Sequence, residues 1–244
     1  MLLKYQYRSF MKKLTISRKD LKNNLKIIRT RLNSFGKDDS GNLPKIIAVV
    51  KGNGMGLGLV EYSKFLINNG IDFLAVANLE EALLLRQAGI EEEILMLTPF
   101  SKEKELAQLI ENKITLTVSS KEQIEIIEKI AKIQDCEAKT HFKIDTGFGR
   151  YGFLYSNQND ILEAFKMCDN LKITGTYTHF AKPMEQKFTE KQFDRFLEVI
   201  KFLKQEGQTP RNVALFSLYI IFEISYDELK CDSNRFYFAG KNFA

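Results

Sequence analysis

The chain has 244 residues and a formal net charge of +5, with 44% hydrophobic and 27% charged residues. This length can bury a sizeable core, and an α/β barrel of this size is commonly one domain. Basic and acidic residues are mixed along the chain, without a basic tail or an aromatic-basic stripe, which argues against a nucleic-acid partner. No apolar run is long enough to span a bilayer, and residues 1–10 lack a secretory signal. We therefore expect a cytoplasmic protein without membrane contact.

The three cysteines, Cys136, Cys168 and Cys231, show neither a pairing pattern nor metal-ligand spacing. An odd number of unpaired cysteines suits a reducing cytoplasm. We expect all three to be structural thiols, because free cysteine is commonly a small buried hydrophobe.

The chain begins with an extension, residues 1–13, in which Met11 is an alternative start. A short strand is predicted at 14–16, followed by a helix with Ser17 as its N-cap and apolar residues at helical spacing through position 32. Residues 34–43 are rich in Gly, Asp and Ser and are predicted to be a loop.

From residue 45 onward, strand-like and helix-like runs alternate. Strands are predicted at 46–50, 73–77, 94–97, 114–118, 138–144 and 173–179, and helices at 59–69, 80–88, after Ser101, at 121–133, near 159–168 and at 190–205, the last capped by Thr189 and stopped by Gly207. Six such units, without a run of consecutive strands, indicate a parallel sheet.

A doubly wound sheet and a (β/α)8 barrel of the TIM type both fit this rhythm. Evenly spaced units without a nucleotide-binding fingerprint favour the barrel. In such barrels the functional residues lie at the carboxyl ends of the strands. Six units are fewer than a closed barrel needs, so we predict an incomplete barrel with exposed strand edges.

The most informative stretch runs from Ile46 to Gly58, where five apolar residues precede Lys51 and four glycines follow at alternate positions. A lysine desolvated at the end of a buried strand can have a neutral amine that forms a Schiff base with an aldehyde. The ordinary alternative is a strand-end lysine with its ammonium group in water. The glycine spacing matches neither the dinucleotide fingerprint nor the NTP-binding loop.

The run from Val50 to Gly58 resembles the V-K-x-N-x-Y-G-x-G motif of the alanine racemase family. The resemblance implies that Lys51 carries pyridoxal 5'-phosphate (PLP) and serves as one of two acid/base groups, with Asn53 in support. It also implies a barrel that begins the chain. Met55 stands where the family has a tyrosine that contacts the cofactor phosphate, and a thioether cannot donate that hydrogen bond.

A second run, His141 to Phe153, places Lys143 and Asp145 on one face of a strand and Arg150 in the glycine-rich loop beyond it. On its own this could be a salt-bridged strand end. It resembles the family's K-x-D-T-G-M-G-R-x-G signature, which implies that Arg150 contacts the phenolic oxygen of PLP. Lys143 is then similar to a lysine that is often carbamylated and positions the arginine, and Asp145 supports it.

A third run, Gly175 to Ala181, ends the sixth strand with His179. A lone histidine after a strand is more often structural than catalytic. This run resembles the family's G-x-x-T-H-F-A, which implies that His179 lies near the pyridine ring of PLP. Met184 and Glu185 stand where the family tends to have Asp-Glu.

The resemblance weakens after Pro210. We expect a barrel domain at 14–212 and an atypical tail at 213–244, without the family's phosphate-binding run, its second arginine run or its C-terminal β-domain. One hypothesis is that the tail is a frameshifted translation, because codons for 214–217 and 229–237 can be chosen to encode family-like residues in the next frame.

The resemblance implies a PLP-dependent amino-acid racemase, with alanine as substrate and a homodimer as assembly. Two alternatives stay open: a non-catalytic PLP-binding homeostasis barrel, and an inactive racemase fragment.

Overall fold

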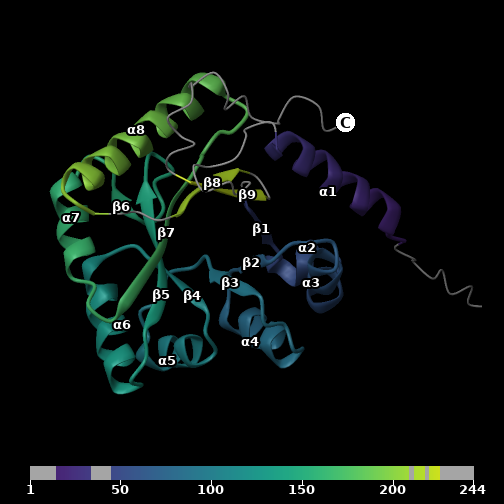
Figure 1. Cartoon of the computed structure of the whole chain (residues 1–244), viewed down its shortest axis with the longest axis horizontal. Helices are drawn as coiled ribbons and strands as arrows, with labels where there is room; N and C mark the ends of the chain where they lie inside the picture. The colour runs from purple at the N-terminus through teal and green to yellow at the C-terminus, as the bar shows by residue number, and fades with distance from the viewer. Residues whose placement is uncertain (1–14, 34–44, 209–211, 218–219, 226–244) are drawn as a thin grey trace, which may run out of the picture.

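The structure is a computed structural model that describes residues 15–33, 45–208, 212–217 and 220–225. Within these ranges the strands form one curled sheet, and helices α3 to α8 lie around its outside (Figure 1). Six strand-then-helix units run in chain order, as the alternation of apolar runs predicts. The predicted α/β class and barrel-like form are confirmed.

The elements keep the predicted order. The strands are β1 (Lys45–Val49), β2 (Phe73–Val76), β3 (Glu93–Met96), β4 (Thr115–Val118), β5 (Ala138–Asp145), β6 (Phe153–Leu154), β7 (Leu171–His179), β8 (Asn212–Ser217) and β9 (Ile220–Ser225). The helices are α1 (Arg18–Asn33), α2 (Lys51–Met55), α3 (Leu59–Ile67), α4 (Leu79–Gln87), α5 (Glu103–Glu111), α6 (Lys121–Ile133), α7 (Gln158–Lys166) and α8 (Gln186–Gln205).

The described strands close into a ring. Parallel pairing runs from β1 through β2, β3, β4, β5 and β7 to β8, and β9 pairs antiparallel with both β8 and β1. The expectation of exposed strand edges is therefore wrong for this part of the chain, because β8 and β9 supply backbone hydrogen bonds to β7 and β1. The expectation that no strands follow one another is also wrong, since β8 and β9 form a hairpin.

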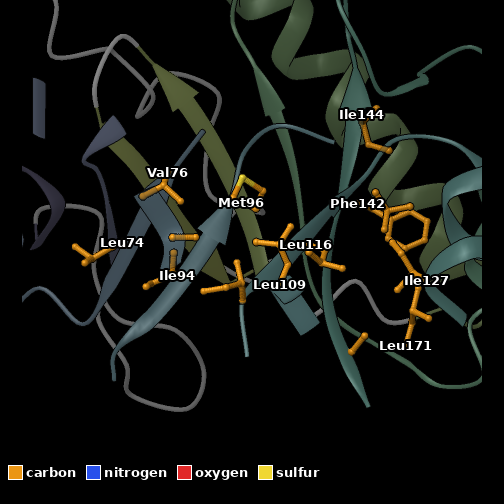
Figure 2. Packing of buried hydrophobic residues seen from close by; sticks show 14 of the residues in the cluster. Leu74, Val76, Ile94, Met96, Leu109, Leu116, Ile127, Phe142, Ile144 and Leu171 are labelled. Carbon is orange, nitrogen blue, oxygen red and sulfur yellow. The ribbon is translucent and has the colours of Figure 1, made fainter. Parts of the chain in front are cut away.

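The strands alternate between two hydrophobic clusters. Outward residues such as Leu74, Ile94 and Phe142 pack under the helices, and Figure 2 shows this layer between sheet and helices. Residues of the opposite parity, among them Ile47 and Tyr177, form a smaller cluster inside the ring. Period-two alternation therefore decides which side chains point into the barrel.

Buried His141 also lies on the inward face, opposite Gly175 of β7. The register between β5 and β7 shifts at this point, and His141 Cε1 lies 2.6 Å from where a Cβ on residue 175 would sit. Gly175 is thus required by a close approach of side chain to backbone.

Helix starts were predicted with mixed success. Ser17 accepts a hydrogen bond from Asp20 N at the start of α1, and α6 has the predicted bounds with Ser120 as its N-cap. The predicted start of α8 is wrong: the helix begins at Gln186, and Thr189 lies buried inside it, donating its hydroxyl to Lys182 O (3.0 Å). Thr189 resembles an N-cap in sequence, but its hydroxyl holds the preceding loop.

Several expectations fall outside the described residues: the extension at 1–13, the loop at 34–43, Cys231, and the tail beyond 225. Thr15 and Ile16 are described and are not in a strand. Cys136 is exposed, contrary to the expected burial, whereas Cys168 is half-buried. Burial raises the pKa of the Cys168 thiol to about 12, so this thiol is unreactive. None of the described helices is both long and apolar enough to cross a bilayer.

Candidate active site

A cavity of about 680 Å³ opens at the carboxyl ends of the strands. Its lining includes Lys51, Met55, Lys143, Arg150 and His179, which the three sequence motifs supply. These residues lie at or near the carboxyl ends of β1, β5 and β7, and the first is separated from the last by more than half of the chain. The volume falls within the range of roughly 300–1,000 Å³ typical of small-molecule sites.

Lys51 lies two residues after Val49, whose side chain packs inside the ring. The period-two alternation of β1 therefore also points Lys51 inward. Val50 is fully buried and its N–H donates to Ala75 O (2.8 Å), whereas the Lys51 side chain is exposed at the cavity. Of the two alternatives for Lys51, a desolvated amine and an ordinary solvent-exposed lysine, the structure shows the exposed one. The buried strand ends one residue earlier, and the chain turns at once into an open loop.

The glycine-rich stretch after Lys51 forms a left-handed turn. Gly52, Asn53, Gly54 and Met55 all have positive φ angles, of 64°, 54°, 63° and 55°. This conformation costs a non-glycine residue roughly 1–2 kcal/mol. At buried Gly54 a Cβ would also lie 3.3 Å from backbone atoms of Leu59. The glycines at 52 and 54 are thus explained by backbone conformation and, at Gly54, by close packing.

Asn53 supports the turn and does not line the cavity. Its Oδ1 accepts a hydrogen bond from Leu59 N (3.0 Å), and its carbonyl accepts from Gly58 N (3.0 Å). The side chain thus caps the first turn of α3 while the backbone holds a conformation that Asn tolerates better than most residues.

Glu81, a buried residue on α4, was not among the site residues predicted from sequence. Its carboxylate accepts hydrogen bonds from Gly52 N (2.6 Å) and Asn53 N (3.2 Å) through Oε1, and from Ala77 N (3.2 Å) through Oε2. The available signal was Asn78 followed three residues later by Glu81, a capping-box pattern. Here the carboxylate reaches across to the neighbouring strand end.

Lys143 is the most buried charged group of the cavity, with 2% of its surface exposed. Its Nζ donates to Ile144 O (2.9 Å) and lies 5.6 Å from the ring of Tyr177 and 6.0 Å from that of Tyr151. Burial lowers the pKa of Lys143 to about 8; Asp145 opposes the shift and Arg150 adds to it. At pH 7 Lys143 is therefore mainly protonated, with about a tenth of the amine neutral.

Arg150 lies in the loop after β5, with its guanidinium between two aromatic rings. The Arg150 Cζ is 4.6 Å from the ring of Phe148 and 4.6 Å from that of Tyr151. Cation–π contacts with both rings hold the guanidinium at the cavity although the side chain is exposed.

Asp145 shapes the loop that carries Arg150. Its Oδ1 accepts hydrogen bonds from Gly147 N, Phe148 N and Gly149 N, at 2.9, 2.8 and 3.2 Å. Asp145 is not part of the cavity lining. These three hydrogen bonds hold the backbone of the loop that carries Arg150.

His179 ends β7 and is half-buried at the cavity. Burial, together with the positive charges of Arg150, Lys143 and Lys51, lowers the pKa of His179 to about 4. The imidazole is therefore neutral near pH 7.

Comparisons with known proteins agree with this arrangement. The model of the family described as alanine racemase, N-terminal domain, matches residues 16–225. The chain belongs to the alanine racemase family. An alanine racemase of Methanococcus maripaludis is 38% identical over 190 residues, which are 77% of this chain and 48% of that protein.

Solved alanine racemase structures share the fold. The alanine racemase of Bacillus anthracis with bound L-Ala-P matches at a TM-score of 0.69 and 33% identity, covering 81% of this chain and 50% of that one. A histidine racemase of Leuconostoc mesenteroides matches at a TM-score of 0.65 and 26% identity, covering 73% and 46%. The chain thus spans about half the length of the relatives it matches.

Two tyrosines complete the wall of this racemase-type cavity. Tyr151 donates its hydroxyl to Leu97 O (3.0 Å), and Tyr177 shares a hydrogen bond with Thr117 Oγ1 (2.8 Å). Burial raises the pKa of both phenols. Both phenols therefore stay protonated, and their rings lie beside the Lys143 amine. Neither tyrosine was among the site residues predicted from sequence, although both lie within the motif runs.

The charged side chains on the described lining are all cationic: Lys51, Lys143, Arg150 and Lys182. PLP carries an aldehyde, a phenolic oxygen and a phosphate, so its charge and the accessible Lys51 amine fit this donor set. Met55 is the exception, because its thioether offers the phosphate no hydrogen bond.

Proposed function

We propose that this chain is the PLP-binding part of an amino-acid racemase, an isomerase that acts on alanine. The observation that carries the proposal is the meeting of Lys51, Arg150 and His179, from three separate strand ends, at one cavity. Each also matches a family motif in family order. When bound, PLP supplies an electron sink that stabilises negative charge at the α-carbon of an amino acid.

Lys51 has the central role in this proposal. Its amine faces the cavity on a backbone fixed by the left-handed turn, so it can hold the cofactor and move a proton at the substrate α-carbon. Arg150 offers guanidinium N–H donors to the phenolic oxygen of PLP. His179, neutral near pH 7, offers a flat ring face without adding positive charge.

Lys143 acts on Arg150 in the same proposal. A neutral amine can react with CO₂: its nitrogen bonds to the carbon, loses a proton and becomes a carbamate anion. Coulombic coupling between Lys143 and Arg150 is already present, so reversing the sign of Lys143 turns repulsion into attraction. The carbamate would then hold the guanidinium in place.

The experiment begins with PLP added to the purified protein, followed by borohydride reduction and peptide mapping. We expect the label on Lys51 and its loss in Lys51→Ala, with Lys64→Ala as the control because Lys64 is an exposed lysine on α3. Exchange of the alanine α-hydrogen in heavy water is then followed by NMR. A wild-type chain with no label on Lys51 would overturn the proposal.

A second candidate is PLP binding without racemisation. It rests on the same meeting of Lys51, Arg150 and His179 at the cavity and leaves out the proton transfer. Label on Lys51 without α-hydrogen exchange supports this candidate. Histidine is the second substrate to assay, because one structural neighbour is a histidine racemase. Homodimer assembly and a cytoplasmic location belong to the same proposal, and light scattering on the purified chain tests the first.

A further inference from the structure

Glu81 connects α4 to the turn that carries Lys51. Its side chain is 8% exposed, and its own N–H is fixed by Asn78 Oδ1 (2.8 Å) at the start of the helix. One carboxylate oxygen accepts from Gly52 N and Asn53 N, the two N–H groups directly after Lys51, and the other accepts from Ala77 N. The carboxylate thus joins the ends of β1 and β2.

The backbone on the other side of Lys51 is fixed as well. Val50 N donates to Ala75 O (2.8 Å), and Val50 O accepts from Gly54 N (2.8 Å). Lys51 therefore lies between a strand hydrogen bond and the Glu81 carboxylate. Because the Lys51 side chain is long and exposed, the direction in which it leaves the backbone decides where its amine can reach.

The left-handed turn needs such an anchor. Asn53 and Met55 are not glycines, yet both have positive φ angles, and this conformation is disfavoured without compensating contacts. Hydrogen bonds from N–H groups to an ionised carboxylate are among the strongest in proteins. They are formed here at the two residues that set the turn.

We propose that Glu81 is a positioning residue for Lys51, holding the left-handed turn so that the lysine amine is presented to the cavity. The inference rests on the proposed function for the identity of the cofactor. Glu81 is not part of the cavity lining, and its hydrogen bonds go to the N–H groups of Gly52 and Asn53, so it acts on Lys51 through the backbone.

Glu81→Gln is the sharpest test. The amide keeps the size of the side chain but replaces one acceptor oxygen with an NH₂ donor, which must face either the Gly52 and Asn53 N–H groups or that of Ala77. Glu80→Gln is the matched control, because Glu80 is the exposed neighbour on the same first turn of α4. Should Glu81→Gln not fold, Glu81→Asp keeps the charge and shortens the side chain.

Two readouts are needed. Hydrogen exchange of the Gly52 and Asn53 amides, measured without PLP, should accelerate about tenfold or more in Glu81→Gln, the effect of one lost charge-assisted hydrogen bond. Borohydride labelling of Lys51 by limiting PLP should fall about fivefold or more by the same reasoning. Glu80→Gln should leave both unchanged, and the α4 amides report that the fold persists.

The outcomes separate the two proposals. Unchanged exchange at Gly52 and Asn53 overturns the positioning role, as does faster exchange with unchanged labelling of Lys51. If PLP does not label Lys51 in the wild-type chain, the proposed function fails. The positioning role is then decided by reductive methylation of Lys51 with formaldehyde, which should slow in Glu81→Gln and not in Glu80→Gln; equal rates overturn it.

Discussion

The rings of Phe148 and His179 meet edge to face, with centroids 4.6 Å apart and planes inclined at 73°. The same phenylalanine ring lies 4.6 Å from the guanidinium carbon of Arg150. Phe148 therefore links the loop after β5 to the end of β7, the two segments that carry the proposed PLP contacts. The family pattern quoted for this loop has methionine at the position of Phe148.

We predict that Phe148→Leu weakens PLP binding. Loss of the ring removes one cation–π contact of Arg150, worth about 0.5–1 kcal/mol at an exposed site, so the Kd should rise about two- to fivefold. Absorbance titration with PLP measures it. Phe202→Leu is the control, because Phe202 lies near the C-terminal end of α8, and the cavity-lining residues 180–184 precede the other end of that helix. The Kd of Phe148→Met should fall between those of Phe148→Leu and Phe202→Leu. A Kd unchanged by Phe148→Leu would remove Phe148 from the site.

Stability should fall on acidification because of His141. Burial lowers the pKa of His141 to about 4 from 6.5, with Glu93 opposing the shift. Below pH 6.5 the unfolded chain binds a proton that the folded chain does not, so the free energy of unfolding decreases from pH 6.5 toward pH 4 and levels off below it. For this shift the linkage relation gives about 3 kcal/mol.

Chemical denaturation between pH 4 and 7 measures this slope. His141→Leu should reduce the slope to the part left by His179, since the substitution removes one titrating group, whose Nδ1 makes no hydrogen bond within the described part of the chain. The chain has two histidines, and the pKa of His179 is also lowered to about 4, so His179→Leu should remove that contribution and keep the one from His141. Equal slopes in the wild-type chain and His141→Leu would contradict the assignment.

Much of this site could be predicted from sequence, because its residues follow the period-two alternation of side chains along the strands. Lys51, Lys143 and His179 each continue the inward face of a strand. Those positions could be predicted from period-two alternation, and the family motifs then assigned their roles. The six parallel strands with their following helices were predictable for the same reason.

What sequence could not supply depends on tertiary contacts. Glu81 has the local pattern of a capping residue, and only the fold brings Gly52 within its reach. Exposure of Lys51 depends on where β1 ends relative to the turn. The pairing of β9 with β1 joins residues far apart in the chain, and the apolar run at 215–222 does not indicate an antiparallel hairpin by itself.

We predict that Lys143 takes up CO₂ in a pH-dependent manner. Carbamate formation needs the neutral amine, whose fraction rises as the pH passes about 8. Labelling with ¹³C-bicarbonate should give a carbamate signal that grows from pH 7 to pH 9 and is absent in Lys143→Met. Lys139→Met is the control, because Lys139 lies four residues earlier on β5 and is about half exposed. A signal that persists in Lys143→Met would place the carbamate elsewhere.

The Met55 position offers a gain of function. Met55 lines the cavity and is 37% exposed, and the family has a tyrosine at this position of the motif. Met55→Tyr should tighten PLP binding, because a phenol can donate a hydrogen bond to the phosphate. One such bond is worth about 0.5–1.5 kcal/mol, or about a two- to tenfold lower Kd.

Met55→Phe separates the hydroxyl from the ring. It adds the aromatic surface without the donor, so any tightening that it shares with Met55→Tyr comes from packing. Both variants keep a non-glycine side chain at a φ of 55°, so the backbone cost is the same in each. Absorbance titration with PLP, and in parallel with pyridoxal, which lacks the phosphate, measures the difference. If Met55→Tyr gains as much for pyridoxal as for PLP, the phosphate does not lie against residue 55.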